Sequence, residues 1–396
     1  MNQRFTTSTF RKNTSILAVL ALAALAVVGI TSARGQDESA RLTAFFAVHP
    51  LDNPDFKALQ DQSDAKAGLK VFTYHVTSTR AGSKGQKFTG MMVGDSPFTS
   101  KGTTTTTMQI VPVIVTIKGH TFDPTKPDAT CDAGQTPLTQ FQQSPLVLPA
   151  KFTLNGVNVG TTQYSDAFQR ANFWKPIVKN GGTYHTDLKV VTLKPIHYNQ
   201  PTKGVILTNG ACGGPLGGLE FITLLNDFEK TVVPKLQNSG QGVGPTTFPI
   251  FQFYNVVGYV QTVNQCCVGG FHDAFNSAKG VQTYGVFDYD SLGVFKNVAD
   301  VNSASHEIDE WVNDPFGVNP TPPWGHIGQV SGCQNNLEVG DPLSQSTPID
   351  IKMSNGMTYH LQELAFFSWF YGPPSIGTGG KFSDNGSFTS AQGACH

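Results

Sequence analysis

Short runs of β-branched and aromatic residues, bounded by Gly, Asn and Asp, recur along most of the chain. Such runs predict strands. The run 108–117 is continuous enough for a buried strand, but Pro112 inside it predicts an edge strand or a bulge. In 152–159, Asn155-Gly156 separates two apolar segments, which predicts a hairpin. Further strands are predicted at 71–76, 188–193, 250–254, 256–260 and 284–289.

Apolar residues three and four positions apart are confined to a few segments. Residues 219–237 show this spacing, which predicts a helix that Pro234 kinks or ends. A short helix is predicted at 166–173. Residues 37–66 are polar and predict a poorly ordered lead-in or a short helix, while 80–106 and 119–150 predict loops.

The composition excludes several classes of protein. Only 14% of the 396 residues are charged, against about 25% in an ordinary domain. With 41 Gly and 24 Pro, this disfavours a coiled coil or a helix bundle. The 39% hydrophobic residues are enough to bury a core. A net charge of -1 gives no reason to expect nucleic acid or an anionic membrane as a partner.

The N-terminus carries a targeting signal. Arg4, Arg11 and Lys12 precede an apolar run at 16–30, and small residues follow it. This pattern predicts a secretory signal peptide over 1–35 and a secreted or periplasmic protein. A membrane anchor is the alternative, but the run is too short to span a bilayer comfortably. No stable membrane insertion is therefore expected after signal removal.

An even number of cysteines in an exported chain predicts disulfides. We expect the adjacent pair Cys266-Cys267 to reach two different partners. A thiolate metal site is the alternative for that pair, although no C-x-x-C spacing accompanies it. The disulfide candidates are Cys131, Cys212, Cys266, Cys267, Cys333 and Cys395.

The strongest chemical signal is the segment 303–316, SASHEIDEWVNDPF. Ser303 or Ser305 can cap a helix here, and Asp314-Pro315 should stop it. The chain contains only seven Glu, and three of them lie between 307 and 338. A protein that seldom uses Glu has concentrated it around this segment.

Within such a helix, His306 and Glu310 share one face and can converge on one metal ion. Glu307 lies beside them and can reach a metal-bound water. The spacing is that of H-E-x-x-H with Glu in place of the second His. The alternative is a surface helix with acidic side chains and a structural histidine.

A zinc site needs a third ligand, and the following segment offers several. We prefer Glu338, with Asp341 orienting His306 from behind. His326 is the alternative ligand, or a hydrogen-bond donor to the transition state. Asp314 lies on the ligand face, although Pro315 after it indicates a capping or turn role. The motif makes Zn²⁺ the expected ion, and the number of carboxylates makes Ca²⁺ a possible one.

Residues 212–342 resemble zincin metallopeptidases in layout, with a backing helix, strands, an edge strand and then an active-site helix. Glu338-Val339-Gly340-Asp341 resembles the element that supplies the third ligand in thermolysin-like enzymes. A closer resemblance, over roughly a third of the chain, is to the phosphate-induced, exordium-like secreted proteins and their bacterial relatives. It rests on 266–272 (CCVGGFH), 305–315, Trp324 and 338–341. By this resemblance His272 is a possible metal ligand or substrate contact; the alternative is a loop histidine with no role in the site.

The expected fold is α+β. We expect a zincin-like mixed sheet with a backing helix and an active-site helix in 211–396, and a β-rich N-terminal half. That half comprises a lead-in with the first strand at 36–106 and a β-rich region at 107–210.

The expected function is metal-dependent hydrolysis of a peptide, with Glu307 transferring the proton and the edge strand at 284–289 holding the peptide. The alternative is a non-catalytic secreted or cell-surface binding protein with a structural ion. A carbohydrate hydrolase built on Asp288 and Asp290 is a third possibility.

Overall fold

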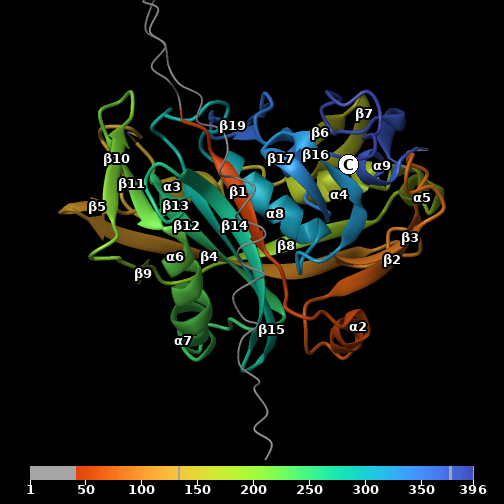
Figure 1. Cartoon of the computed structure of the whole chain (residues 1–396), viewed down its shortest axis with the longest axis horizontal. Coiled ribbons are helices and arrows are strands. Elements are labelled where there is room, and N and C mark those ends of the chain that lie inside the picture. Colours follow the sequence, from red (N-terminus) through yellow and green to blue (C-terminus); the bar gives the residue numbers. More distant parts are fainter. Residues whose placement is uncertain (1–41, 133, 374–376, 396) are drawn as a thin grey trace, which may run out of the picture.

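The computed structural model describes residues 42–132, 134–373 and 377–395 (Figure 1). The predicted signal peptide lies outside these ranges. No helix within them is both long and apolar enough to cross a membrane.

A large mixed sheet forms the centre of the molecule, and helices pack on it, as expected for an α+β fold (Figure 1). Strands from all three regions predicted after residue 35 share it. The main strand order is β10 (Val205–Asn209), β11 (Pro215–Glu220), β13 (Val256–Tyr259), β14 (Cys266–Ser277), β15 (Gly280–Tyr289), β12 (Thr247–Tyr254), β4 (Thr103–Ile117) and β5 (His120–Phe122). Beside this path, β1 (Phe45–His49) pairs with β14, and β8 (His185–Thr192) and β9 (Ile196–His197) pair with β4.

Alternate residues of the central strands enter two different hydrophobic cores. Ile110 and Ile250 belong to the core that contains helix α8 (Asn302–Asn313). Their neighbours Val111 and Phe251 belong to a second core on the opposite face. That face is covered by one helical run made of α6 (Phe221–Asp227), a π-helical turn η1 (Phe228–Val232) and α7 (Val233–Gln237). The predicted backing helix thus lies across the sheet from α8.

The remaining elements surround α8 and the sheet edges. They are α2 (Phe56–Asp64), β2 (Val71–Thr77), β3 (Lys87–Val93), α3 (Pro137–Gln142), β6 (Ala150–Leu154), β7 (Val157–Thr162), α4 (Tyr164–Asn172), α5 (Trp174–Lys179), β16 (Pro320–Ile327), β17 (Val330–Asn336), η2 (Asp341–Leu343), β18 (Ile349–Lys352), β19 (Thr358–Leu361), α9 (Phe367–Tyr371) and η3 (Thr378–Gly380).

Most of the elements predicted from periodicity are confirmed. The hairpin is β6–β7, and both turn residues have positive φ, 51° at Asn155 and 76° at Gly156. The helix predicted at 219–237 forms and continues past Pro234. Proline cannot donate a helical hydrogen bond, and here it is the second residue of α7, which begins where the π-helical turn ends.

Three predicted irregular segments contain regular structure. Residues 80–106, predicted as a loop, hold β3 and the start of β4, residues 103–106. The reason is a run of five threonines, 103–107, whose β-branched side chains favour a strand. Residues 119–150 hold β5 and α3. Residues 37–66 hold the short helix that was one of the two predicted alternatives, α2, and also the unpredicted β1, a strand of the main sheet.

Neither strand predicted as an edge lies at an edge of the sheet, although the alternative predicted at Pro112, a bulge, agrees with a break in the strand pairing there. β4 has neighbours on both sides, and Pro112 pairs with Gln252 of β12 on one of them. On the other side the ladder is broken opposite Pro112, because β8 ends at Thr192 and β9 begins at Ile196. β15 lies between β14 and β12, so it cannot hold a peptide by a free edge.

All six cysteines are paired. The disulfides are Cys131–Cys212, Cys333–Cys395 and Cys266–Cys267. The prediction that Cys266 and Cys267 reach two different partners is therefore wrong, because the neighbouring thiols are bonded to each other at the start of β14.

Candidate metal centre

Helix α8 presents the HEIDE segment to the sheet. Its N-cap is Val301, which makes no side-chain hydrogen bond, so the prediction of a serine cap is wrong. The Ser305 hydroxyl instead donates to the carbonyl of Asn302 and accepts from the backbone N–H of Gln362. The helix ends before Asp314, as predicted, and the Asp314 carboxylate accepts from the backbone of Val318 and Asn319. That is a turn role.

His306 and Glu310 meet on one face of α8, as their spacing predicts. His306 Nε2 lies 2.9 Å from Glu310 Oε2. His306 Nδ1 lies 2.9 Å from Gln362 Oε1, and the amide nitrogen of Gln362 donates to the carbonyl of Gly340. Because the bond to Gly340 fixes the orientation of the Gln362 amide, the amide oxygen faces His306 and accepts a hydrogen bond from Nδ1–H. The lone pair of His306 is thus on Nε2, directed at Glu310, as a metal ligand requires.

The segment 338–341 wraps over this pair. The backbone N–H groups of Gly340 and Asp341 donate to Glu310 Oε1 over 3.0 and 3.3 Å. Glu338 accepts from Asn336 through Oε1 over 2.7 Å. An added Cβ on Gly340 would lie 2.6 Å from His306 Nδ1, so glycine is needed for this close approach.

Asp341 lies beside the ligand nitrogen rather than behind the ring. Its Oδ1 is 3.5 Å from His306 Nε2, and Gln334 donates to its Oδ2 over 3.1 Å. The orienting hydrogen bond that we expected from Asp341 comes from Gln362 instead. Asp341 therefore stands among the potential metal ligands.

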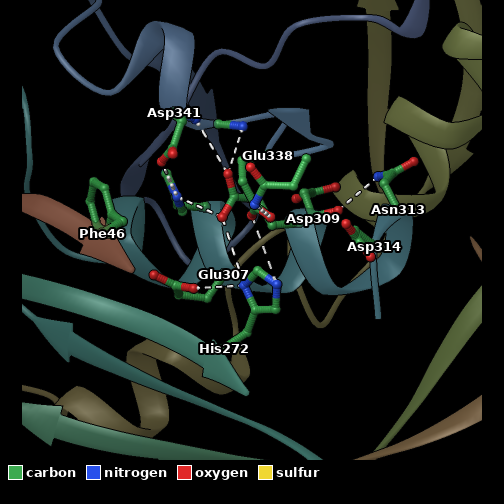
Figure 2. Close-up of polar contacts among 12 residues, drawn as sticks. Phe46, His272, Glu307, Asp309, Asn313, Asp314, Glu338 and Asp341 are labelled. Carbon is green, nitrogen blue, oxygen red and sulfur yellow. Dashed lines mark hydrogen bonds and ion pairs between the residues drawn. The ribbon is translucent and has the colours of Figure 1, made fainter. Parts of the chain in front are cut away.

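His272 enters the site from β14. Its Nδ1 is 3.3 Å from Glu307 Oε2 and 3.7 Å from Glu310 Oε2, and its Nε2 is 3.9 Å from Glu338 Oε2. Figure 2 shows His272 rising from the strand toward Glu307. It is thus neither a loop residue nor peripheral. Gly270, two residues earlier, leaves room for Glu307, because a Cβ there would lie 2.7 Å from Glu307 Oε1.

These side chains form one buried group, which we call the α8 cluster. Its members are His272, His306, Glu307, Glu310, Glu338 and Asp341, and Asp341, at 7% exposure, is the most accessible. Four of their atoms have no hydrogen-bond partner among the described residues: His272 Nε2, His306 Nε2, Glu307 Oε1 and Glu338 Oε2.

The α8 cluster has an excess of negative charge in a dry environment. The ion pairs of its four carboxylates within the described ranges are with histidines and not with lysine or arginine. Burial raises the pKa of its three glutamates well above the usual range, and neighbouring carboxylates add to this. Burial also raises the pKa of Asp341 to about 6 and lowers the pKa of His272 to about 3 and of His306 to about 4.

The donor atoms fit a metal ion. Two triads have their ligand atoms within 4.8 Å of one another, namely His272, Glu307, Glu310 and His306, Glu310, Asp341. Imidazole and carboxylate together suit zinc and related divalent ions. A divalent cation would also stabilise the ionised carboxylates that burial disfavours.

The structure does not bring His326 to this cluster. It is an exposed residue in the β16–β17 hairpin, and its Nε2 lies 3.9 Å from Cys333 Sγ. Within the described ranges it makes no hydrogen bond or ion pair with the α8 cluster. Its hairpin instead extends toward the C-terminal disulfide.

Sequence reasoning missed two residues that complete the site. Phe46 of β1 stacks on His306 with ring centroids 3.9 Å apart (Figure 2). Gln362 fixes the orientation of His306. Both come from segments remote from α8, and neither carries a local signal. A scan of protein-family models gives no match to the chain, and a search of curated proteins returns no similar sequence.

Proposed function

We propose that this protein is an exported metal-dependent hydrolase, a zinc metallopeptidase that cleaves peptide bonds. The observation that carries the proposal is the α8 cluster. Buried polar atoms in folded proteins are almost always paired, and buried charges are paired or bind metals. The α8 cluster holds four carboxylates, and four of its potential ligand atoms have no hydrogen-bond partner among the described residues. Both observations support a bound cation.

His306 Nε2 and Glu310 are the proposed ligands, with Asp341 completing their compact triad. Glu338, the third ligand preferred from the sequence, belongs to neither triad, and it remains a candidate through its unpartnered Oε2, 3.9 Å from His272 Nε2. A bound zinc ion supplies a Lewis acid and a water of lowered pKa. The Gln362 amide holds His306 in the tautomer that binds. The backbone amides of 340 and 341 hold one oxygen of Glu310, which leaves the other for the ion.

Glu307 is the proposed proton carrier. Its carboxylate accepts a proton from the attacking water and returns it to the leaving amine. Its Oε2 is held near His272, while its Oε1 has no hydrogen-bond partner among the described residues.

The test combines metal content with one substitution. We expect the wild-type protein, purified without chelator, to contain zinc and to cleave members of a peptide library. Glu307→Gln should reduce cleavage at least about a hundredfold with zinc content unchanged. If Glu307→Gln cleaves as fast as the wild type, Glu307 is not the proton carrier.

The second candidate is a non-catalytic secreted protein with a structural ion. The burial of the site favours this second candidate. In structural metal sites protein ligands fill every coordination position, whereas catalytic sites leave one position for water or substrate. Here the most exposed member of the cluster is 7% accessible. This candidate predicts that chelation lowers the melting temperature, while the metal-loaded wild type cleaves no peptide in the library.

A further inference from the structure

A second group of potential ligands lies on the other face of the sheet. It consists of His49, Glu229 and Asp273, which we call the back cluster. Adjacent residues of a strand point to opposite faces. His272 therefore faces α8, while Asp273 faces the helical run α6–η1–α7 that carries Glu229.

Three separate segments meet at the back cluster. His49 is the last residue of β1 and pairs in register with Asp273 of β14. Glu229 comes from the π-helical turn, a distortion that is frequent at functional sites. Glu229 is also one of only seven glutamates in the whole chain. His49 and Asp273, which are far apart in sequence, meet here because β1 pairs with β14.

The distances suit a metal ion. His49 Nδ1 lies 3.0 Å from Glu229 Oε1 and 3.4 Å from Asp273 Oδ1. Ligands at 2.0–2.2 Å from a tetrahedral zinc ion are separated by about 3.3 Å. All three ligand atoms lie within 4.8 Å of one another.

The back cluster also has an unpartnered buried atom and access to water. Asp273 is fully buried, and its Oδ2 has no hydrogen-bond partner among the described residues. The buried hydroxyl of Tyr284 is the polar neighbour of this carboxylate. The side chains of His49 and Glu229 are 25% and 21% exposed, so water can complete the coordination of an ion.

We infer that the back cluster is a second divalent-cation site, which takes Zn²⁺ or a similar ion through His49, Glu229 and Asp273. This inference does not depend on the proposed hydrolase. The site lies at the end of β1, the strand that places Phe46 on His306. An ion there would join β1, β14 and the helical run, and so would brace the strand that carries His272.

The test is zinc stoichiometry in the mature full-length chain, measured by elemental analysis after equilibration with Zn²⁺ and gel filtration. His49→Gln and Glu229→Gln should each lose one equivalent relative to the wild type. His306→Gln should lose a different equivalent, and combining it with His49→Gln should lose both. His75→Gln is the matched control, because His75 is exposed and its Nδ1 bonds to Thr89.

Anomalous diffraction at the zinc edge locates the ions in the wild type without relying on the folding of a variant. A peak between His49, Glu229 and Asp273 supports the inference. No peak there, with unchanged stoichiometry in His49→Gln and Glu229→Gln, overturns it and leaves an ion pair with a protonated His49. Loss of zinc in His306→Gln alone would support the α8 site and refute the back site. Loss in His49→Gln alone would do the reverse.

Discussion

Two groups of histidine and carboxylate residues, equally compact, differ in how their polar atoms are satisfied. One is the α8 cluster. The other, which we call the α4 cluster, consists of Asp166, His185 and Asp187, and its ligand-type atoms also lie within 4.8 Å of one another. Asp166 is as buried as the glutamates of α8. Residue type, proximity and burial alone therefore do not separate the two.

Hydrogen bonding does separate them. Asp166 Oδ2 accepts from Thr162 and from His185 Nδ1, each over 2.7 Å, and its Oδ1 accepts from the backbone of Thr186 over 2.6 Å. Arg170 supplies a positive charge, with Nη1 3.4 Å from His185 Nε2. The α4 cluster thus completes itself with protein groups. The α8 cluster leaves two imidazole nitrogens and two carboxylate oxygens without partners and has no such cation.

The largest expected difference between the clusters is their response to chelation. Removing the ion from the α8 cluster leaves buried carboxylates without a counter-charge. If the ion is present at about a thousand times its Kd, its loss costs about 4 kcal/mol. We expect the melting temperature to fall by about 5 °C in calorimetry with a chelator. An unchanged melting temperature would mean that the α8 cluster, like the α4 cluster, is complete without a metal.

The next largest effect belongs to the α4 cluster. Asp166→Asn removes the charge that accepts from Thr162 and His185, and we expect a loss of about 3 kcal/mol in unfolding free energy. The loss should be the same with and without chelator, because no ion is involved. Asp187→Asn, at the half-buried third member, is the matched control and should cost less than about 1 kcal/mol. If the loss of unfolding free energy in Asp166→Asn depends on the chelator, the α4 cluster also binds an ion.

The part of the α8 cluster that was predictable from sequence is the part encoded locally. His306 and Glu310 meet because they are four residues apart on a helix, and Glu307 follows from the same geometry. The segment 338–341 was found through its acidic residues and its resemblance to a known element. The sequence alone does not place His272, because its position depends on the pairing of β14 with β1 and β15.

Non-local contacts explain what the sequence did not reveal. Phe46 reaches His306 only because β1 pairs with β14, more than two hundred residues later. Gln362 lies beyond β19, and a glutamine in an aromatic run gives no hint of a ligand contact. The bond between Cys266 and Cys267 was unexpected for a similar reason, because a count of cysteines carries no information on pairing.

A smaller effect should come from the close approach of the backbone to His306. Gly340→Ala places a methyl group 2.6 Å from His306 Nδ1 and forces the ring or the segment to move. We expect a loss of about 2 kcal/mol in the stability of the metal-loaded protein and weaker zinc binding by titration calorimetry. Gly244→Ala is the control, since no atom lies within 4 Å of its added Cβ. Wild-type zinc affinity in Gly340→Ala would mean that this approach does not position the ligand.

The smallest predicted effect is the most specific to metal binding. Gln362→Met removes the acceptor that keeps the Nδ1 proton of His306 in place, so Nε2 is no longer held as the unprotonated nitrogen. Changes to such supporting groups typically weaken metal binding by 10- to 100-fold. We expect about a tenfold loss of zinc affinity, near the lower end of that range, because Phe46 still stacks on the ring.

The matched control for this change is Gln252→Met. Gln252 is also fully buried, but neither atom of its amide has a hydrogen-bond partner among the described residues. Replacing an unsatisfied buried amide by an apolar group of similar size should leave stability unchanged or raise it, and zinc affinity should not change. If the two variants bind zinc equally well, Gln362 only fills space. If Gln362→Met alone weakens binding, the hydrogen bond to His306 serves the metal, which no comparable bond does in the α4 cluster.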